Sequence, residues 1–311
     1  VSHAGDINGD GLDDYVIGAP YADPYNRDYA GETYVIFGNS QLHPTHFSLR
    51  DLDGTNGFQI YGSESGDYSG YSVHYAGDVN ADGYDDLIIG ARMADPDGVT
   101  DSGESYLIYG KDNGFESSLE LSNLDGTTGI RIQGANDFDW SGTSVATAGD
   151  INGDGYDDIL IGAEMADPDE KSAAGKTYVI LGTFAGLEHP LSLSTLDGTN
   201  GFVINGLNKY DYSGRVVNSA GDINGDGYSD IFVTNDNENF LYYNDGEWDF
   251  TRIYNEPLVE ISNLLDGRWM KAEKWSVYVE YTERLLTFVA EQYGGLNIVR
   301  IGRAVCRPNP D

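Results

Sequence analysis

The chain has 311 residues, and its 52 Asp and Glu outnumber its 17 Lys and Arg to give a formal charge of −35. This charge excludes nucleic acid as a partner, because phosphates need clustered basic side chains, and it disfavours an anionic membrane surface. The chain is 40% apolar and 12% aromatic, enough for a sizeable core, and its single Cys excludes a disulfide framework. No apolar run is long enough to span a bilayer. With no signal peptide before Val1, the sequence is interpreted as a processed chain or a fragment.

Three sequence landmarks recur along the chain at one constant spacing. They are an acidic loop that begins at Gly5, Gly77, Gly149 and Gly221, an LDG string at Leu52, Leu124 and Leu196, and a D-Y/W-S-G string at Asp67, Asp139 and Asp211. Three landmarks in one register indicate a structural repeat of about 72 residues.

Each repeat contains four short segments typical of β-strands. In the second repeat these are YSVHYAGD, DLIIGA, GESYLIYG and GIRIQG, which are rich in Val, Ile and Tyr and bounded by Gly and Asp. The pattern predicts an all-β fold, a β-propeller-like array of four-stranded antiparallel blades. A solenoid of parallel strands is the alternative, although solenoid repeats usually have a shorter period.

The repeats weaken toward the C-terminus, which divides the chain into two predicted parts. Residues 1–275 form about four blades, with a degraded landmark at Ile261–Gly267, and residues 276–311 form a small irregular closing or assembly segment. Within that segment, SVYVEY and LNIVRIGRAV are expected to be strands. The apolar spacing over Glu280–Tyr293 predicts a helix that ends at Gly294.

The acidic loops share the form D-x-N-x-D-G-x-x-D, which places oxygen-bearing side chains at positions 1, 3, 5 and 9 and a Gly at position 6. Carboxylates about 5 Å apart repel one another by roughly 3 kcal/mol per pair. A cation within the loop would offset this repulsion, and an all-oxygen set in a flexible loop favours Ca²⁺ over Zn²⁺ or Mg²⁺. Solvated Asn-Gly and Asp-Gly turns are the alternative for one copy, but four copies in register favour a metal site.

These loops are not EF-hands, because position 12 is an apolar residue of the next strand: Ile17, Ile89, Ile161 or Val233. The loops, followed by VIGAP, LIIGA and LIGA, instead resemble the FG-GAP repeat of integrin α-subunit propellers over residues 1–240. The LDG landmark makes them similar to the integrin-like repeat proteins of bacteria. The resemblance implies one Ca²⁺ per loop, about four ions in all, held by side chains and by the carbonyl at position 7. The implied ligands are Asp6, Asn8, Asp10, Leu12 and Asp14; Asp78, Asn80, Asp82, Tyr84 and Asp86; Asp150, Asn152, Asp154, Tyr156 and Asp158; and Asp222, Asn224, Asp226, Tyr228 and Asp230.

Two features depart from the family pattern. Propellers of this family usually have seven blades, more than a chain of 311 residues can supply at this repeat length. Val1 also falls within the expected first strand, so the first blade is predicted to be incomplete at its N-terminus. An unfinished sheet exposes an edge that another chain, or the C-terminal segment, could pair with.

The connections on the face opposite the loops carry aromatic residues beside aspartates. Tyr68, Trp140 and Tyr212 follow the landmark aspartates, and Asp23, Asp95 and Asp167 lie in A-D-P turns. Such pairs suit sugar or peptide binding, but their recurrence in every repeat favours a structural role in packing and turn capping. The pair His43 and His46 is interpreted as solvated, and His3 and His74 as structural. No catalytic motif accompanies Cys306.

Together these features predict a non-enzymatic, extracellular or cell-surface module for adhesion or ligand binding, in which Ca²⁺ stabilises each blade. Its expected partners are a protein or glycan ligand, or copies of itself. One alternative is a structural subunit of an extracellular fibre or surface layer built by strand exchange between chains. Another is the accessory propeller of a secreted polysaccharide-active enzyme.

Overall fold

A computed structural model describes residues 1–40, 47–112, 114–184, 186–235, 240–244, 250–253, 277–279, 287–292 and 295–300. The chain divides into two compact units, Val1–Ile253 and Tyr254–Asp311. The predicted boundary at residue 275 and the degraded landmark at 261–267 lie outside the described residues. The boundary therefore stays a prediction.

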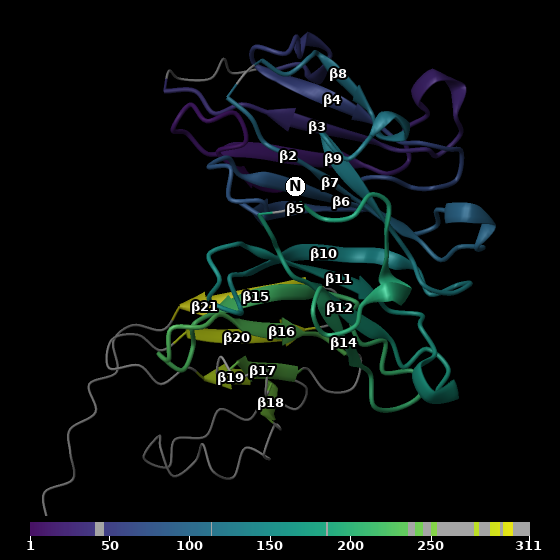
Figure 1. Cartoon of the computed structure of the whole chain (residues 1–311), viewed down its shortest axis with the longest axis vertical. Coiled ribbons are helices and arrows are strands. Elements are labelled where there is room, and N and C mark those ends of the chain that lie inside the picture. Colours follow the sequence, from purple (N-terminus) through teal and green to yellow (C-terminus); the bar gives the residue numbers. More distant parts are fainter. Residues whose placement is uncertain are drawn as a thin grey trace, which may run out of the picture. The chain divides into compact units, whose positions relative to one another are not determined.

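The described residues of the first unit form four sheets in chain order, each with four antiparallel strands, and two of these sheets have a fifth, parallel strand (Figure 1). The first contains β1 (Ser2–Gly5), β2 (Asp14–Ala19), β3 (Glu32–Ile36) and β4 (Gly57–Tyr61). The second contains β5 (Ser72–Gly77), β6 (Asp86–Ala91), β7 (Glu104–Ile108) and β9 (Gly129–Gln133). The third contains β10 (Ser141–Gly149), β11 (Asp158–Ala163), β12 (Lys176–Ile180) and β14 (Gly201–Asn205). The fourth contains β15 (Val217–Gly221), β16 (Asp230–Val233), β17 (Phe240–Asn244) and β18 (Phe250–Ile253). The predicted all-β array of propeller-like blades is confirmed.

The first strands of successive blades lie side by side, β1 beside β5, β5 beside β10 and β10 beside β15. Buried apolar side chains fill the space between neighbouring blades. Leu87 and Ile89 of β6 belong to the core shared with the first blade, whereas Ile88 belongs to the core shared with the third. The middle strands are therefore buried on both faces, which explains why they read as continuous apolar runs in an antiparallel sheet.

Two short strands each pair with the outer strand of the preceding blade. The strand β8 (Ser118–Glu120) of the second repeat pairs in parallel with β4 of the first blade, and β13 (Leu191–Ser192) of the third repeat pairs in parallel with β9 of the second. The outer edges of β4 and β9 are thus covered by a segment of the next repeat. The sequence did not predict these strands, which are only three and two residues long.

Six 3₁₀ turns lie in the described residues of the repeats. One set lies within the loops after the second strands and contains η1 (Pro24–Asn26), η3 (Pro96–Gly98) and η5 (Pro168–Glu170). The other set precedes the LDG landmark and contains η2 (Leu49–Asp51), η4 (Leu121–Asn123) and η6 (Leu193–Thr195). Among the described residues, no helix is both long and apolar enough to cross a membrane.

The second unit contains one described sheet of β19 (Val277–Val279), β20 (Thr287–Gln292) and β21 (Gly295–Arg300), in that order. The two strands expected in this segment are confirmed as β19 and β21. The helix expected over 280–293 is wrong, because Thr287–Gln292 is a strand that pairs with both neighbours. Backbone pairing on both sides outweighs an apolar spacing that also fits a helix.

Candidate functional site

Each acidic loop connects the first and second strands of its blade. The loops span residues 6–13, 78–85, 150–157 and 222–229, and the next strand begins at or beside the ninth position. A β-bulge precedes each loop, between Tyr75 and Gly77 in the second blade. Gly77 has φ +83°, a conformation that favours glycine, so the bulge turns the chain out of the sheet and into the loop.

The side chains within a loop are bonded to the loop's own backbone. In the second loop, the N–H of Asp82 donates to Asp78 Oδ1 at 3.0 Å and to Asn80 Oδ1 at 2.9 Å. The Gly83 N–H donates to Asp78 Oδ2 at 2.9 Å, and the Tyr84 N–H donates to Asp82 Oδ1 at 3.0 Å. The other three loops repeat this set. The oxygens at positions 1, 3 and 5 are thereby turned toward the inside of each loop.

The ninth-position aspartate joins the loop to the third strand. Asp86 is fully buried; its Oδ2 accepts from the Val79 N–H at 3.0 Å, and its Oδ1 accepts from the Gly110 N–H at 2.9 Å. Asp14, Asp158 and Asp230 are equally buried and make the same pair of bonds. The aspartate at this position therefore links the loop to the end of the third strand, in addition to being a candidate ligand.

Burial disfavours the ionised form of these ninth-position aspartates. Desolvation raises the pKa of Asp14 to about 7 and the pKa of Asp86 and Asp158 to about 8, and repulsion from the loop aspartates adds to the increase. Burial raises the pKa of Asp230 in the same direction. A cation beside these carboxylates would lower their pKa and remove the cost.

The donor set suits a hard cation such as Ca²⁺. All of the side-chain ligand atoms are oxygens, and every loop carboxylate has at least one oxygen that accepts a single hydrogen bond and so retains a lone pair. Within the described part of the chain, no group of three or more acidic, His or Cys side chains meets the arrangement expected of an ion site. The assignment of the twenty ligands, including the carbonyls of Leu12, Tyr84, Tyr156 and Tyr228, therefore stays a prediction.

On the opposite connections, the landmark aspartates are buried turn caps. Asp67 Oδ2 accepts from the Glu64 N–H at 2.9 Å, and Asp211 Oδ2 accepts from the Asn208 N–H at 2.9 Å. Asp139 accepts from the Asn136 side chain at 3.0 Å. The aspartates of the A-D-P turns also accept from backbone N–H groups of their own loops. These bonds agree with the structural interpretation of the recurring aspartates.

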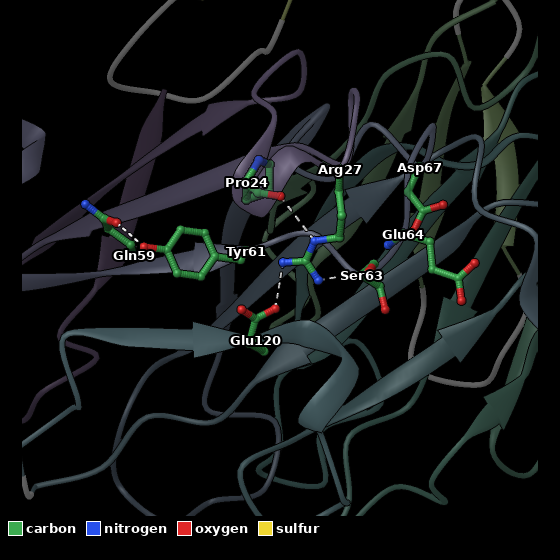
Figure 2. A network of polar contacts seen from close by, with 8 residues as sticks. All are labelled: Pro24, Arg27, Gln59, Tyr61, Ser63, Glu64, Asp67 and Glu120. Carbon is green, nitrogen blue, oxygen red and sulfur yellow. Dashed lines mark hydrogen bonds and ion pairs between the residues drawn. The ribbon is translucent and has the colours of Figure 1, made fainter.

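An ion pair ties the first connection to the second repeat. Figure 2 shows the Arg27 guanidinium among the carbonyls of Pro24 and Ser63 and the carboxylate of Glu120 in β8, which is 2.8 Å away. Because both side chains are about one-quarter exposed, the pair contributes on the order of 1 kcal/mol. The ion pair holds β8 of the second repeat against the first blade.

One polar cluster on these connections does not recur from repeat to repeat. The Arg92 guanidinium lies 3.8 Å from the Tyr71 ring centroid and 4.9 Å from that of Trp140. Glu164 lies 3.9 Å from Arg92 and 3.3 Å from Arg215. The sequence analysis did not predict this cluster; the one available signal was that Glu164 stands 72 residues after Arg92, at the same position of the next repeat.

Two of the five histidines contact each other in the described residues. His3 in β1 and His74 in β5 contact each other edge to face at 5.7 Å between ring centroids, in agreement with a structural role. His43, His46 and Cys306 lie outside the described residues.

A profile of the FG-GAP repeat matches residues 2–36, 69–108, 141–180 and 214–247, one segment per blade. The chain is 31% identical to integrin alpha pat-2 of Caenorhabditis elegans over 231 residues, which are 74% of this chain and 17% of that protein. It is 28% identical to integrin alpha-5 of Xenopus laevis over 74% of this chain and 19% of that protein. It is also 28% identical to integrin alpha-PS3 of Drosophila melanogaster over 88% of this chain and 21% of that protein. The chain thus spans about a fifth of the length of these relatives.

Proposed function

Because this chain belongs to the FG-GAP repeat proteins of integrin α type, we propose that it is a non-enzymatic extracellular module for adhesion or ligand binding. In this proposal one Ca²⁺ lies in each D-x-N-x-D-G-x-x-D loop and stabilises the blade. The observation that carries it is that four loops share one hydrogen-bond pattern and one buried aspartate. The integrin α relatives support adhesion as the function and the cell surface as the location.

The ion would supply the positive charge that these loops otherwise lack. The side chains at positions 1, 3, 5 and 9 and the carbonyl at position 7 would hold it. The internal hydrogen bonds already order the loop, so less conformational entropy is lost when the ion binds. Extracellular calcium is abundant enough to fill sites of modest affinity.

The ligand-binding role can be tested on arrays of extracellular-matrix proteins and glycans. The chain should bind a restricted set of ligands in millimolar Ca²⁺, and binding should be lost in EGTA. An Asp78→Ala, Asp150→Ala double variant serves as a calcium-site control and should bind weakly under both conditions. Equal binding of every ligand with or without Ca²⁺ would contradict the proposal.

The second candidate function is assembly of copies by strand exchange. The pairing of β8 and β13 with the outer strand of the preceding blade favours it. Phe47 is at the position equivalent to Leu119 of β8 and Leu191 of β13, which lie on the neighbouring blade. Leu191 is 2% exposed, whereas Phe47 is 38% exposed. Residues 47–48 of one copy would pair with the outer blade edge of another. Fibres or oligomers in negative-stain images, abolished by Phe47→Glu, would support assembly; dispersed monomers at high protein and calcium concentrations would contradict it.

A further inference from the structure

Successive acidic loops are joined by hydrogen bonds that run from one repeat to the one before it. Asp85, the eighth residue of the second loop, accepts at Oδ2 from the Asp6 N–H of the first loop at 2.6 Å. Asp157, at the same place in the third loop, accepts at Oδ2 from the Asp78 N–H of the second loop at 3.0 Å. Each donor is the backbone of the residue expected to be the first calcium ligand of its loop.

The chain fits closely around these contacts. Gly5 and Gly77, which precede the donors, have φ +66° and +83°. A Cβ on Gly5 would lie 2.3 Å from Asp85 Oδ2, and a Cβ on Gly77 would lie 2.2 Å from Asp157 Oδ2. Only glycine allows both this backbone conformation and this approach.

Further contacts hold the earlier loop against the later repeat. The Lys111 N–H donates to the Ile7 carbonyl at 3.0 Å, and the Thr183 N–H donates to the Val79 carbonyl at 3.0 Å. The Tyr84 ring covers Gly9, where a Cβ would lie 2.4 Å from the ring. The first loop is therefore clamped by the second repeat, and the second loop by the third.

The joint between the third and fourth loops is different. The eighth position there is Ser229, whose side chain is shorter and uncharged. Within these two loops, both of which the structure describes, no hydrogen bond joins the Asp150 N–H to the Ser229 hydroxyl. The chain thus provides one natural joint without the carboxylate, and this joint can be compared directly with the other two.

We propose that Asp85 and Asp157 are positioning residues that couple calcium binding between adjacent loops, an inference that rests on the proposed calcium sites. The eighth residue lies between two expected ligands, the carbonyl at position 7 and the carboxylate at position 9. An ion in the later loop fixes this segment and therefore fixes the carboxylate that holds the first ligand of the earlier loop. The earlier loop then loses less conformational freedom when its own ion binds, which raises its affinity.

The coupling can be measured with amide hydrogen exchange of the whole chain at increasing Ca²⁺ concentration. Each loop has its own midpoint, the Ca²⁺ concentration at which its amides reach half of their full protection. Asp85→Ala should raise the midpoint of the first loop by at least about fivefold, while the third and fourth loops keep theirs. Asp85→Asn retains an acceptor oxygen and should restore most of the coupling. Asp13→Ala is the matched control, because it removes the same charge from an exposed residue at the same position of the first repeat.

A second variant that should gain coupling keeps the test decisive if Asp85→Ala fails to fold. Ser229→Asp should lower the midpoint of the third loop, because it adds the missing acceptor for the Asp150 N–H. If Ca²⁺ protects none of the loops in the natural chain, the proposed calcium sites fail and the coupling fails with them. If Ca²⁺ protects the loops but Asp85→Ala behaves like Asp13→Ala and Ser229→Asp changes nothing, only the coupling is overturned.

Discussion

Chelation of calcium with excess EGTA should lower the melting temperature of this chain by more than about ten degrees. The three aspartates at positions 1, 5 and 9 of each loop would then face one another without a cation, and the four fully buried aspartates at position 9 would lose the nearby positive charge that favours their ionised form. A site filled at a hundred times its Kd stabilises the native state by about 2.7 kcal/mol, so four sites contribute on the order of 10 kcal/mol. For a domain near 250 residues, 1 kcal/mol changes the melting temperature by about 2–4 °C.

The assay is thermal unfolding followed by circular dichroism, in millimolar Ca²⁺, in EGTA, and in EGTA with Ca²⁺ restored. Restoration should recover the original melting curve, which separates calcium loss from irreversible damage. Mg²⁺ at the same concentration should stabilise less, because it gives up its water ligands reluctantly. An unchanged melting curve in EGTA would refute the reasoning from loop charge to stability.

Three further predictions concern single residues. Gly90→Val should destabilise the chain by at least about 3 kcal/mol in urea unfolding, because a Cβ there would lie 2.1 Å from the Gly142 carbonyl of the next repeat; a change below about 1 kcal/mol would contradict this close packing. Asp86→Ala should cost about 2–4 kcal/mol even in EGTA, because it leaves two buried N–H groups unbonded, whereas a loss seen only with Ca²⁺ would show a purely metal-binding role. Burial raises the pKa of Asp67 to about 7, so the fold favours its neutral form; stability in saturating Ca²⁺ should fall as pH rises from about 4 to about 7, and Asp67→Asn should flatten that decline. An identical pH profile for the variant and the natural chain would rule out Asp67 as the source.

The repeat register predicted the blades well, because every strand must bury the same positions in each copy. The landmark DLIIGA, for example, marks a strand buried on both faces, and β6 has that place. The same register placed the acidic loops between first and second strands, where the structure has them. Local spacing and repetition were therefore sufficient for the fold class and for the position of the candidate sites.

The contacts between repeats could not be predicted in the same way. The strands β8 and β13 are too short to give a period, and the strands they pair with belong to the preceding repeat. The bond from Asp6 to Asp85 joins residues 79 positions apart, and an acidic residue at position 8 has no local pattern to distinguish it from a solvated one. The helix expected over 280–293 failed for a related reason, because pairing with β19 and β21 decides the structure of β20.

In the proposed function, a divalent ion is an integral part of each loop. A crystal structure of the chain grown in calcium would test it most directly. We expect density inside all four loops, at about 2.3–2.6 Å from the oxygens of positions 1, 3, 5 and 9 and from the carbonyl of position 7. Loops that contain only water in saturating calcium, with the same hydrogen bonds retained, would contradict the claim.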